Sequence, residues 1–136
     1  MAYWLLKTEP GDYSFDNLIK DGKTVWSGVT NNLALIHIRN MKKGDLAFIY
    51  HTGNEKQIVG IAEISSNPYP DPKLKNPKLV VVDLKPKEKL KRYITLSEIK
   101  SDKRFSDFAL VKITRLSVMP VSKEQWEILI KESKKS

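Results

Sequence analysis

The sequence contains no cysteine, only two histidines, and six glycines scattered singly along the chain. Without cysteine there can be no disulfide, no thiolate zinc site and no cysteine nucleophile. Two histidines without cysteine argue against a transition-metal site, so we expect neither a metal nor a cofactor. The glycines fall into neither G-x-x-x-x-G-K nor G-x-G-x-x-G, and G-x-S-x-G is also absent. These absences leave no recognisable phosphate cradle or serine nucleophile, and we expect no catalytic residues.

Long hydrophobic runs are also missing. The N-terminal "MAYWLLKTEP" has only a short apolar stretch, which Lys7 interrupts, and no basic segment precedes it. This pattern is too short for a signal-peptide core or a membrane span. We therefore expect no membrane partner and a cytoplasmic location, or a nuclear one in a eukaryote.

Basic residues outnumber acidic ones, with 24 Lys and Arg against 16 Asp and Glu, for a formal net charge of +8. A surplus of this sign favours polyanionic partners through electrostatic steering and counterion release. The alternative is a lysine-rich solvated surface with no specific partner. With 136 residues, 40% of them hydrophobic, the chain is expected to form a single domain over residues 1–136.

Hydrophobic patterning and capping signals predict short strands and helices in alternation. We expect strands at 3–9, 78–86 and 109–118, a hairpin over 45–66, and helices at 15–20, from 32 to 41, after Thr95 and after Ser122. Leu33 and Ile36, joined by Leu35, are assigned to the apolar face of the second helix. The three prolines of "NPYPDP" argue against regular structure in that later segment. Because the connections are too short for repeated βαβ crossovers, the fold class is α+β, a small mixed or antiparallel barrel flanked by short helices.

Aromatic side chains provide the first candidates for a site. Trp4 lies in the first strand and is assigned to the core. Trp26, within "VWSGVT", is either a core residue before a turn or the wall of a pocket. Tyr50 adjoins His51 at a strand end, and Tyr69 stands between prolines. A flat aromatic pocket near basic charge would suit a nucleobase taken out of its stack.

Polar residues near these aromatics are weighed against structural roles. Asn31 could offer its amide to a base edge. Lys7 and Glu9 alternate along the first strand and therefore share one face, where they form either part of a cleft or a surface ion pair. Glu9 and Asp12 could form an acid and base pair, but Asp12 follows "PG" and is interpreted as a turn residue instead. His37 is interpreted as a structural residue of the second helix.

Several segments, in this order and spacing, resemble the EVE domain family. They are "YWLLKTEPGDYSFDNL", "VWSGVTN", "MKKGDLAFIYH", "IVGIAEI", "YPDP" and "RFSDFALVKITRLSVMPVSKEQWE", and together they cover essentially the whole chain. The resemblance implies a PUA-like fold, a β-barrel flanked by short helices and similar in architecture to YTH and ASCH domains. It also implies binding of a modified base of DNA or RNA, with the base inserted in a pocket.

The family's motifs, matched to this sequence by position, combine with the candidate residues above to give a predicted site. Trp26 and Tyr50 would flank the base, the backbone at Gly28 and Val29 would approach it, and Asn31, Thr8 and His51 would hydrogen-bond its edge. The complete predicted ligand-binding set is Lys7, Thr8, Glu9, Trp26, Gly28, Val29, Asn31, Tyr50, His51 and Tyr69, with Arg39 and Arg115 on the nucleic-acid backbone. The family's usual arginine after "GV" is Thr30 here, which removes one cation.

The function predicted from these observations is non-enzymatic binding of a modified nucleobase in DNA or RNA. One alternative is a metal-independent ribonuclease that uses Lys7, Glu9 and His51. Another is a small-molecule or protein-binding module with an incidental basic surface. The sequence identifies no protein partner.

Overall fold

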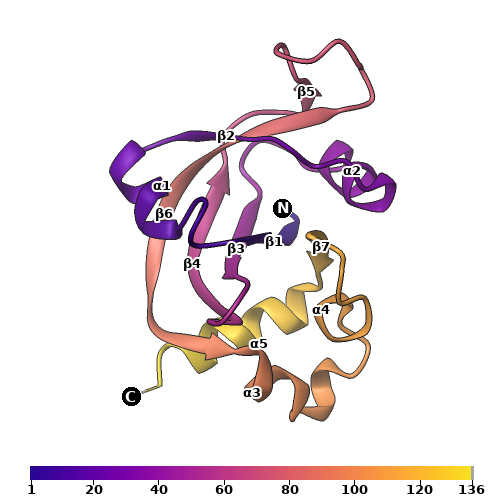
Figure 1. The fold of residues 1–136 in the computed structure, drawn as a ribbon. Coiled ribbons are helices and arrows are strands. Elements are labelled where there is room, and N and C mark those ends of the chain that lie inside the picture. Colours follow the sequence, from indigo (N-terminus) through magenta and orange to yellow (C-terminus); the bar gives the residue numbers. More distant parts are fainter. Residues whose placement is uncertain (136) are drawn as a thin grey trace.

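The computed structural model describes residues 1–135 and arranges them around one curled, mixed sheet (Figure 1). Its strands are β1 (Tyr3–Thr8), β2 (Thr24–Trp26), β3 (Leu46–His51), β4 (Gln57–Ile64), β5 (Tyr69–Pro70), β6 (Val80–Thr95) and β7 (Val118–Val121). The helices are α1 (Phe15–Asp21), α2 (Asn32–Arg39), α3 (Leu96–Lys100), α4 (Ala109–Lys112), α5 (Lys123–Ser133) and the 3-10 turn η1 (Lys103–Phe105).

The strands follow the order β2-β6-β4-β3-β1-β7, and β5 pairs with β6 beside this path. The β1–β3 pair is parallel and the other pairs are antiparallel. The predicted PUA-like α+β architecture is confirmed, in the form of a half-barrel: β2 and β7 end the path, and no ladder joins them among residues 1–135. The barrel therefore has an opening between these two edges.

The core lies inside the curled sheet and is closed on one side by α5. Trp126 of α5 stacks on Phe48 of β3 and on Tyr3 of β1, with ring centroids 3.9 and 4.6 Å apart. Trp4 is 5% exposed, and its indole Nε1 donates to the buried carboxylate of Asp45 at 3.0 Å. The prediction that Trp4 belongs to the core is thus confirmed.

Local capping chemistry explains the helix boundaries. Ser14 caps α1 by accepting from the Asn17 N–H, and Gly22 ends this helix in the left-handed conformation at φ 76°. Ser122 caps α5 in the same way. The predicted apolar face of α2 is confirmed at Leu35 but wrong at Leu33 and Ile36, because the buried residues of this helix are Ala34, Leu35 and Ile38.

The other face of α2 carries Leu33 and Ile36, which are 40% and 48% exposed. Both sets of residues fit a helical period, so the sequence pattern did not determine which face packs inward.

Two further predictions need correction. The expected strand over 109–118 is instead α4, a turn and the start of β7, because burial of Phe108 and Leu110 in the hydrophobic core overrides the β-branched content of the segment. The "NPYPDP" segment holds the two-residue strand β5, whose Tyr69 and Pro70 pair with Val81 and Val80 at the edge of the sheet.

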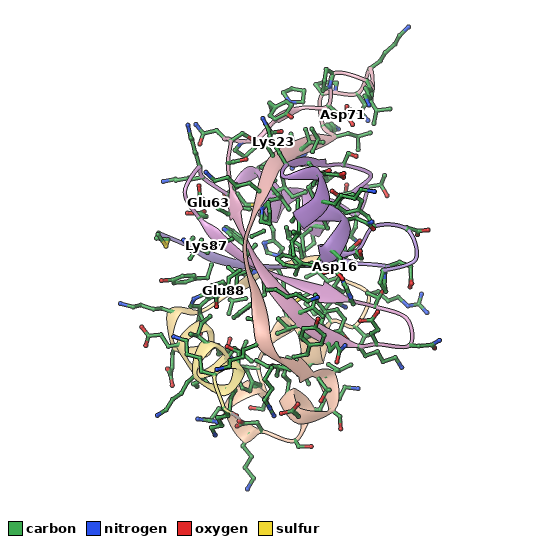
Figure 2. The ribbon with its side chains drawn as sticks, turned by 90° about the vertical axis from the view of Figure 1, so that its left-hand side faces the viewer. Asp16, Lys23, Glu63, Asp71, Lys87 and Glu88 are labelled. Carbon is green, nitrogen blue, oxygen red and sulfur yellow. The ribbon has the colours of Figure 1, made fainter. Side chains whose placement is uncertain are left out.

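The lysine-rich continuation of β6 lies among mixed charges: Figure 2 labels Lys87 and Glu88 of β6 and Glu63 of the neighbouring β4. Lys85 pairs with Glu63 at 3.4 Å and Lys89 with Asp16 at 3.0 Å. Much of this positive charge is therefore compensated locally. Within the described part of the chain, none of the helices is long and apolar enough to cross a membrane.

Candidate functional site

A cleft of about 560 Å³ occupies the opening between the two edges of the half-barrel. Its size lies within the range of ligand pockets in proteins, roughly 300 to 1,000 Å³. It is formed by the end of β1 and the following loop, by β2 and the segment after it, and by the residue before β7. The lining residues are Lys7, Thr8, Glu9, Asp12, Tyr13, Thr24, Val25, Trp26, Ser27, Gly28, Val29, Thr30, Asn31 and Ser117.

Trp26 forms one wall of this cleft. It is the last residue of β2, where it pairs with Val82 of β6, and its half-buried indole packs partly against the core. The other two tryptophans, Trp4 and Trp126, are each 5% exposed. Trp26 is therefore both a packing residue and the tryptophan available to a ligand in the cleft.

The backbone after Trp26 is open to the cleft. Among residues 1–135, the N–H groups of Ser27 to Thr30 donate to no other part of the chain. Gly28 has a φ of 80°, a left-handed conformation that disfavours side chains, and a Cβ built there would meet no atom within 4 Å. The turn thus presents unpaired backbone donors beside the indole of Trp26.

Asn31 ends this open segment and has a structural role that the sequence analysis missed. Its Oδ1 accepts the Ala34 N–H at 3.0 Å and caps α2. Within the described chain the Asn31 amide nitrogen has no hydrogen-bond partner, and the residue lines the cleft. One half of the side chain therefore stabilises the helix, while the other half can donate to a ligand.

Lys7 lies on the opposite side of the cleft and is anchored. Its ammonium donates to the Thr114 carbonyl at 2.9 Å and lies 5.8 Å from the centre of the Tyr50 ring. Burial lowers the pKa of Lys7 because a charged amine is poorly solvated there. Tyr50 is itself 3% exposed and does not line the cleft, so it packs beneath Lys7.

Thr8 and Glu9 line the cleft but already have partners. The Thr8 hydroxyl donates to the Tyr13 carbonyl at 2.6 Å. The Glu9 carboxylate accepts from the Gly11 N–H at 3.2 Å and from the Thr52 hydroxyl at 3.3 Å. These bonds fix the loop after β1 and shape the cleft floor.

Asp12, for which the sequence favours a turn role over an acid and base pair with Glu9, lines the cleft. Its N–H donates to the Glu9 carbonyl at 2.9 Å, which completes the turn. Its exposed carboxylate forms no ion pair or hydrogen bond with the rest of residues 1–135. The Pro-Gly pair before Asp12 signalled the turn but gave no sign that its carboxylate would line a cleft.

His51 lies outside the cleft in a separate cavity with Pro10 and Lys89. Its Nε2 accepts the Phe15 N–H at 3.0 Å, and its Nδ1 lies 2.9 Å from Glu55 Oε1. This hydrogen bond lowers the pKa of Glu55. Both ring nitrogens are engaged, so His51 fastens α1 to β3 and has no free nitrogen for a base edge.

Tyr69 and the two arginines also lie apart from the cleft lining. The Tyr69 hydroxyl donates to Asp83 Oδ1 at 2.5 Å, and this bond raises the pKa of Tyr69 to about 12. Arg39 donates to the Lys78 carbonyl at 2.8 Å. Arg115 is exposed and follows Thr114, the residue that anchors Lys7.

Comparisons with known proteins agree with this architecture. The EVE domain family profile matches residues 2–132. Human thymocyte nuclear protein 1 is 30% identical over 163 aligned positions, which span 95% of this chain and 72% of that protein.

Two solved structures superpose over nearly the whole chain. A Rhodopseudomonas palustris protein determined by NMR has a TM-score of 0.93 at 44% identity, covering 98% of this chain and 93% of its own. The human THYN1 protein, solved in complex with DNA containing 5-methylcytosine, has a TM-score of 0.92 at 29% identity, covering 100% of this chain and 99% of its own. With the family profile matched from residue 2 to residue 132, the chain belongs to the EVE domain family.

Proposed function

We propose that residues 1–136 form a single, non-enzymatic domain that binds DNA carrying a modified base and takes that base into the cleft. The observation that carries this proposal is the position of Trp26, whose indole walls the cleft beside unpaired backbone donors. Stacking of a base on an aromatic ring contributes about 1 to 3 kcal/mol, which a solvated aliphatic wall would not supply.

The polar groups of the cleft suit a base edge better than a phosphate. Asp12 offers a free acceptor, and the Asn31 amide and the backbone after Trp26 offer donors. A carboxylate accepts from the exocyclic amino group of cytosine, whereas it repels a phosphate. Because Lys7 is the one cation among the cleft-lining residues and Glu9 and Asp12 are both acidic, phosphates are expected outside the cleft.

The first candidate for the base is 5-methylcytosine. Val25 and Val29 add apolar surface to the cleft, and an apolar contact is what a base methyl group favours. The structurally similar human THYN1 protein was solved with DNA containing this base. Thr30 stands where the family usually carries arginine, so the flanking sequence that this chain prefers is expected to differ from that of its relatives.

Arg115 and the free N–H groups of Arg39 are proposed to hold the DNA backbone. Arg115 is exposed and follows Thr114, whose carbonyl holds the cleft residue Lys7. One nitrogen of Arg39 is already bonded to the Lys78 carbonyl. Phosphate contacts of this kind set affinity and salt dependence, while contacts in the cleft set the choice of base.

The geometry supports binding over the ribonuclease alternative. Lys7 and Glu9 line the cleft, but His51 lies in a different cavity. In the parallel ladder Lys7 is opposite Tyr50, so the next residue, His51, projects to the other face of the sheet. The three groups would need to converge on one phosphate to cleave RNA.

Fluorescence anisotropy with labelled oligonucleotides tests the proposal. Duplexes identical except for cytosine or 5-methylcytosine should differ in affinity, and Trp26→Ala should remove that difference. Arg115→Ala should weaken binding to both duplexes equally and reduce the salt slope by about one. A folded Trp26→Ala protein that keeps the preference would contradict the proposal; should this variant unfold, Trp26→Leu provides the same test.

Two other outcomes would favour the alternatives. Preference for RNA with the same modified base would support the cleft as the base-binding site but would show that the protein binds RNA and not DNA. Binding that responds to neither salt nor base modification would favour a small-molecule or protein-binding module.

A further inference from the structure

We infer that the loop between β5 and β6, residues 71–79, is a second contact to duplex DNA, in which Leu74 is inserted as a wedge beside the extracted base. This inference rests on the proposed function, because a wedge is needed only where a base leaves its stack. Figure 1 shows this loop projecting from the end of the molecule that carries β2.

The loop lies beside the main cleft. A smaller cavity of about 300 Å³ separates it from β2. Thr24, Val25 and Ser27 line this cavity and also line the main cleft, while Pro72 and Lys73 close it on the loop side. The short strand β2 is therefore a shared wall, and DNA with one base in the main cleft would pass close to the loop.

The loop conformation is held without using Leu74 for packing. Asp71 is 7% exposed, its N–H donates to the Leu79 carbonyl at 2.9 Å, and its Oδ1 accepts the Lys73 N–H at 2.9 Å. Figure 2 shows Asp71 at the base of the projecting loop. At the other end Arg39 donates to the Lys78 carbonyl at 2.8 Å, which fastens the loop to α2.

Leu74 is exposed in strongly basic surroundings. Leu74 is 49% exposed. Leu79 in the same loop is partly buried against the hydrophobic core, so the loop lies near the core without burying Leu74. The segment 72–79 contains Lys73, Lys75 and Lys78 and no acidic residue, and none of these lysines is in an ion pair within residues 1–135.

Charge and apolar surface in this loop point to one partner chemistry. Three lysines around a protruding leucine match the phosphates on either side of a base step, while an apolar side chain can enter the step itself. Proteins that kink or open duplex DNA insert leucine, isoleucine, phenylalanine, methionine or proline in this way. A wedge of this kind would stabilise the gap left when the modified base moves into the cleft.

The test compares Leu74→Ala with the wild-type protein on a 5-methylcytosine duplex and on the corresponding single strand. The variant should lose about tenfold in affinity for the duplex and keep its affinity for the single strand, which has no stack to open. The matched control is Leu33→Ala, since Leu33 is another leucine that is 40% exposed but lies on α2; its binding should equal the wild type. A 2-aminopurine placed next to the modified base should brighten with the wild-type protein and less so with Leu74→Ala.

Equal duplex affinity for Leu74→Ala and the wild type would overturn the wedge, as would an equal loss on duplex and single strand. Wild-type binding to the modified single strand but not to the duplex would overturn the wedge and leave the proposed function standing. No preference for the modified base in either form would overturn the proposed function and the wedge together.

Discussion

Replacing Asn31 separates the structural role of this residue from its proposed role in binding. The Asn31 Oδ1 accepts the Ala34 N–H at 3.0 Å and caps α2, while the amide nitrogen is unpaired within residues 1–135. Serine is an equally good helix cap but has no amide nitrogen, and alanine can neither cap nor donate. Comparing the two substitutions therefore distinguishes the two halves of the side chain.

Loss of a cap of this kind typically costs about 1 kcal/mol. In a domain of this size that corresponds to a fall in Tm of about 3 to 5 °C. We expect this fall for Asn31→Ala and almost none for Asn31→Ser. Both variants should bind 5-methylcytosine DNA several times more weakly, since a hydrogen bond contributes about 0.5 to 1.5 kcal/mol.

Thermal unfolding followed by circular dichroism and anisotropy titrations provide the two readouts. An equal loss of Tm in both variants would refute the capping argument. Wild-type affinity in Asn31→Ser would refute the contact to the base while leaving the capping role intact.

Two further predictions concern the fold around the site. In Gly60→Ala the new Cβ would lie 2.5 Å from the ring of Phe15, so overpacking should lower the free energy of unfolding by about 1 to 3 kcal/mol. In the control Gly11→Ala the nearest atom lies 3.5 Å from the new Cβ, so this variant should unfold in urea like the wild type. The hydrogen bond to Asp83 raises the pKa of Tyr69 to about 12. Because this value lies above the ordinary pKa of tyrosine, the bond stabilises the fold fully below about pH 10, and this stabilisation is lost as the pH rises through about 12. Tyrosinate absorbance should show a component near pH 12 that disappears in Tyr69→Phe; an unchanged titration would contradict the assignment.

Local chemistry made some of the fold predictable from sequence. Ser14 and Gly22 delimit α1 because capping and left-handed backbone depend on residues within one turn. The face of α2 and the structure over 109–118 were not predictable, because they depend on which distant surfaces bury Leu35, Phe108 and Leu110. The opening of the half-barrel likewise depends on long-range pairing, because β2 pairs with β6 and β7 with β1 while no ladder joins β2 to β7 among residues 1–135.

The candidate site was also predictable only in part, because its motifs are local but the directions of its side chains depend on the sheet. "KTEP" and "WSGV" carry polar and aromatic groups that the sheet brings to one cleft. Strand alternation alone did not determine that Tyr50 packs beneath Lys7 or that His51 projects away. The sequence favoured a turn role for Asp12 over a pair with Glu9, because a turn position has an adequate structural explanation without any ligand.

The central claim is that a modified base stacks on Trp26 in the cleft, and tryptophan fluorescence tests it most directly. Trp4 and Trp126 are each 5% exposed, so DNA binding should affect the emission of Trp26 above all. Titration with a 5-methylcytosine duplex should quench the wild-type emission saturably, at lower concentration than the cytosine duplex does. Trp26→Phe should bind the same DNA without that quench. A quench that persists in Trp26→Phe, or wild-type emission unchanged at saturating DNA, would contradict the account.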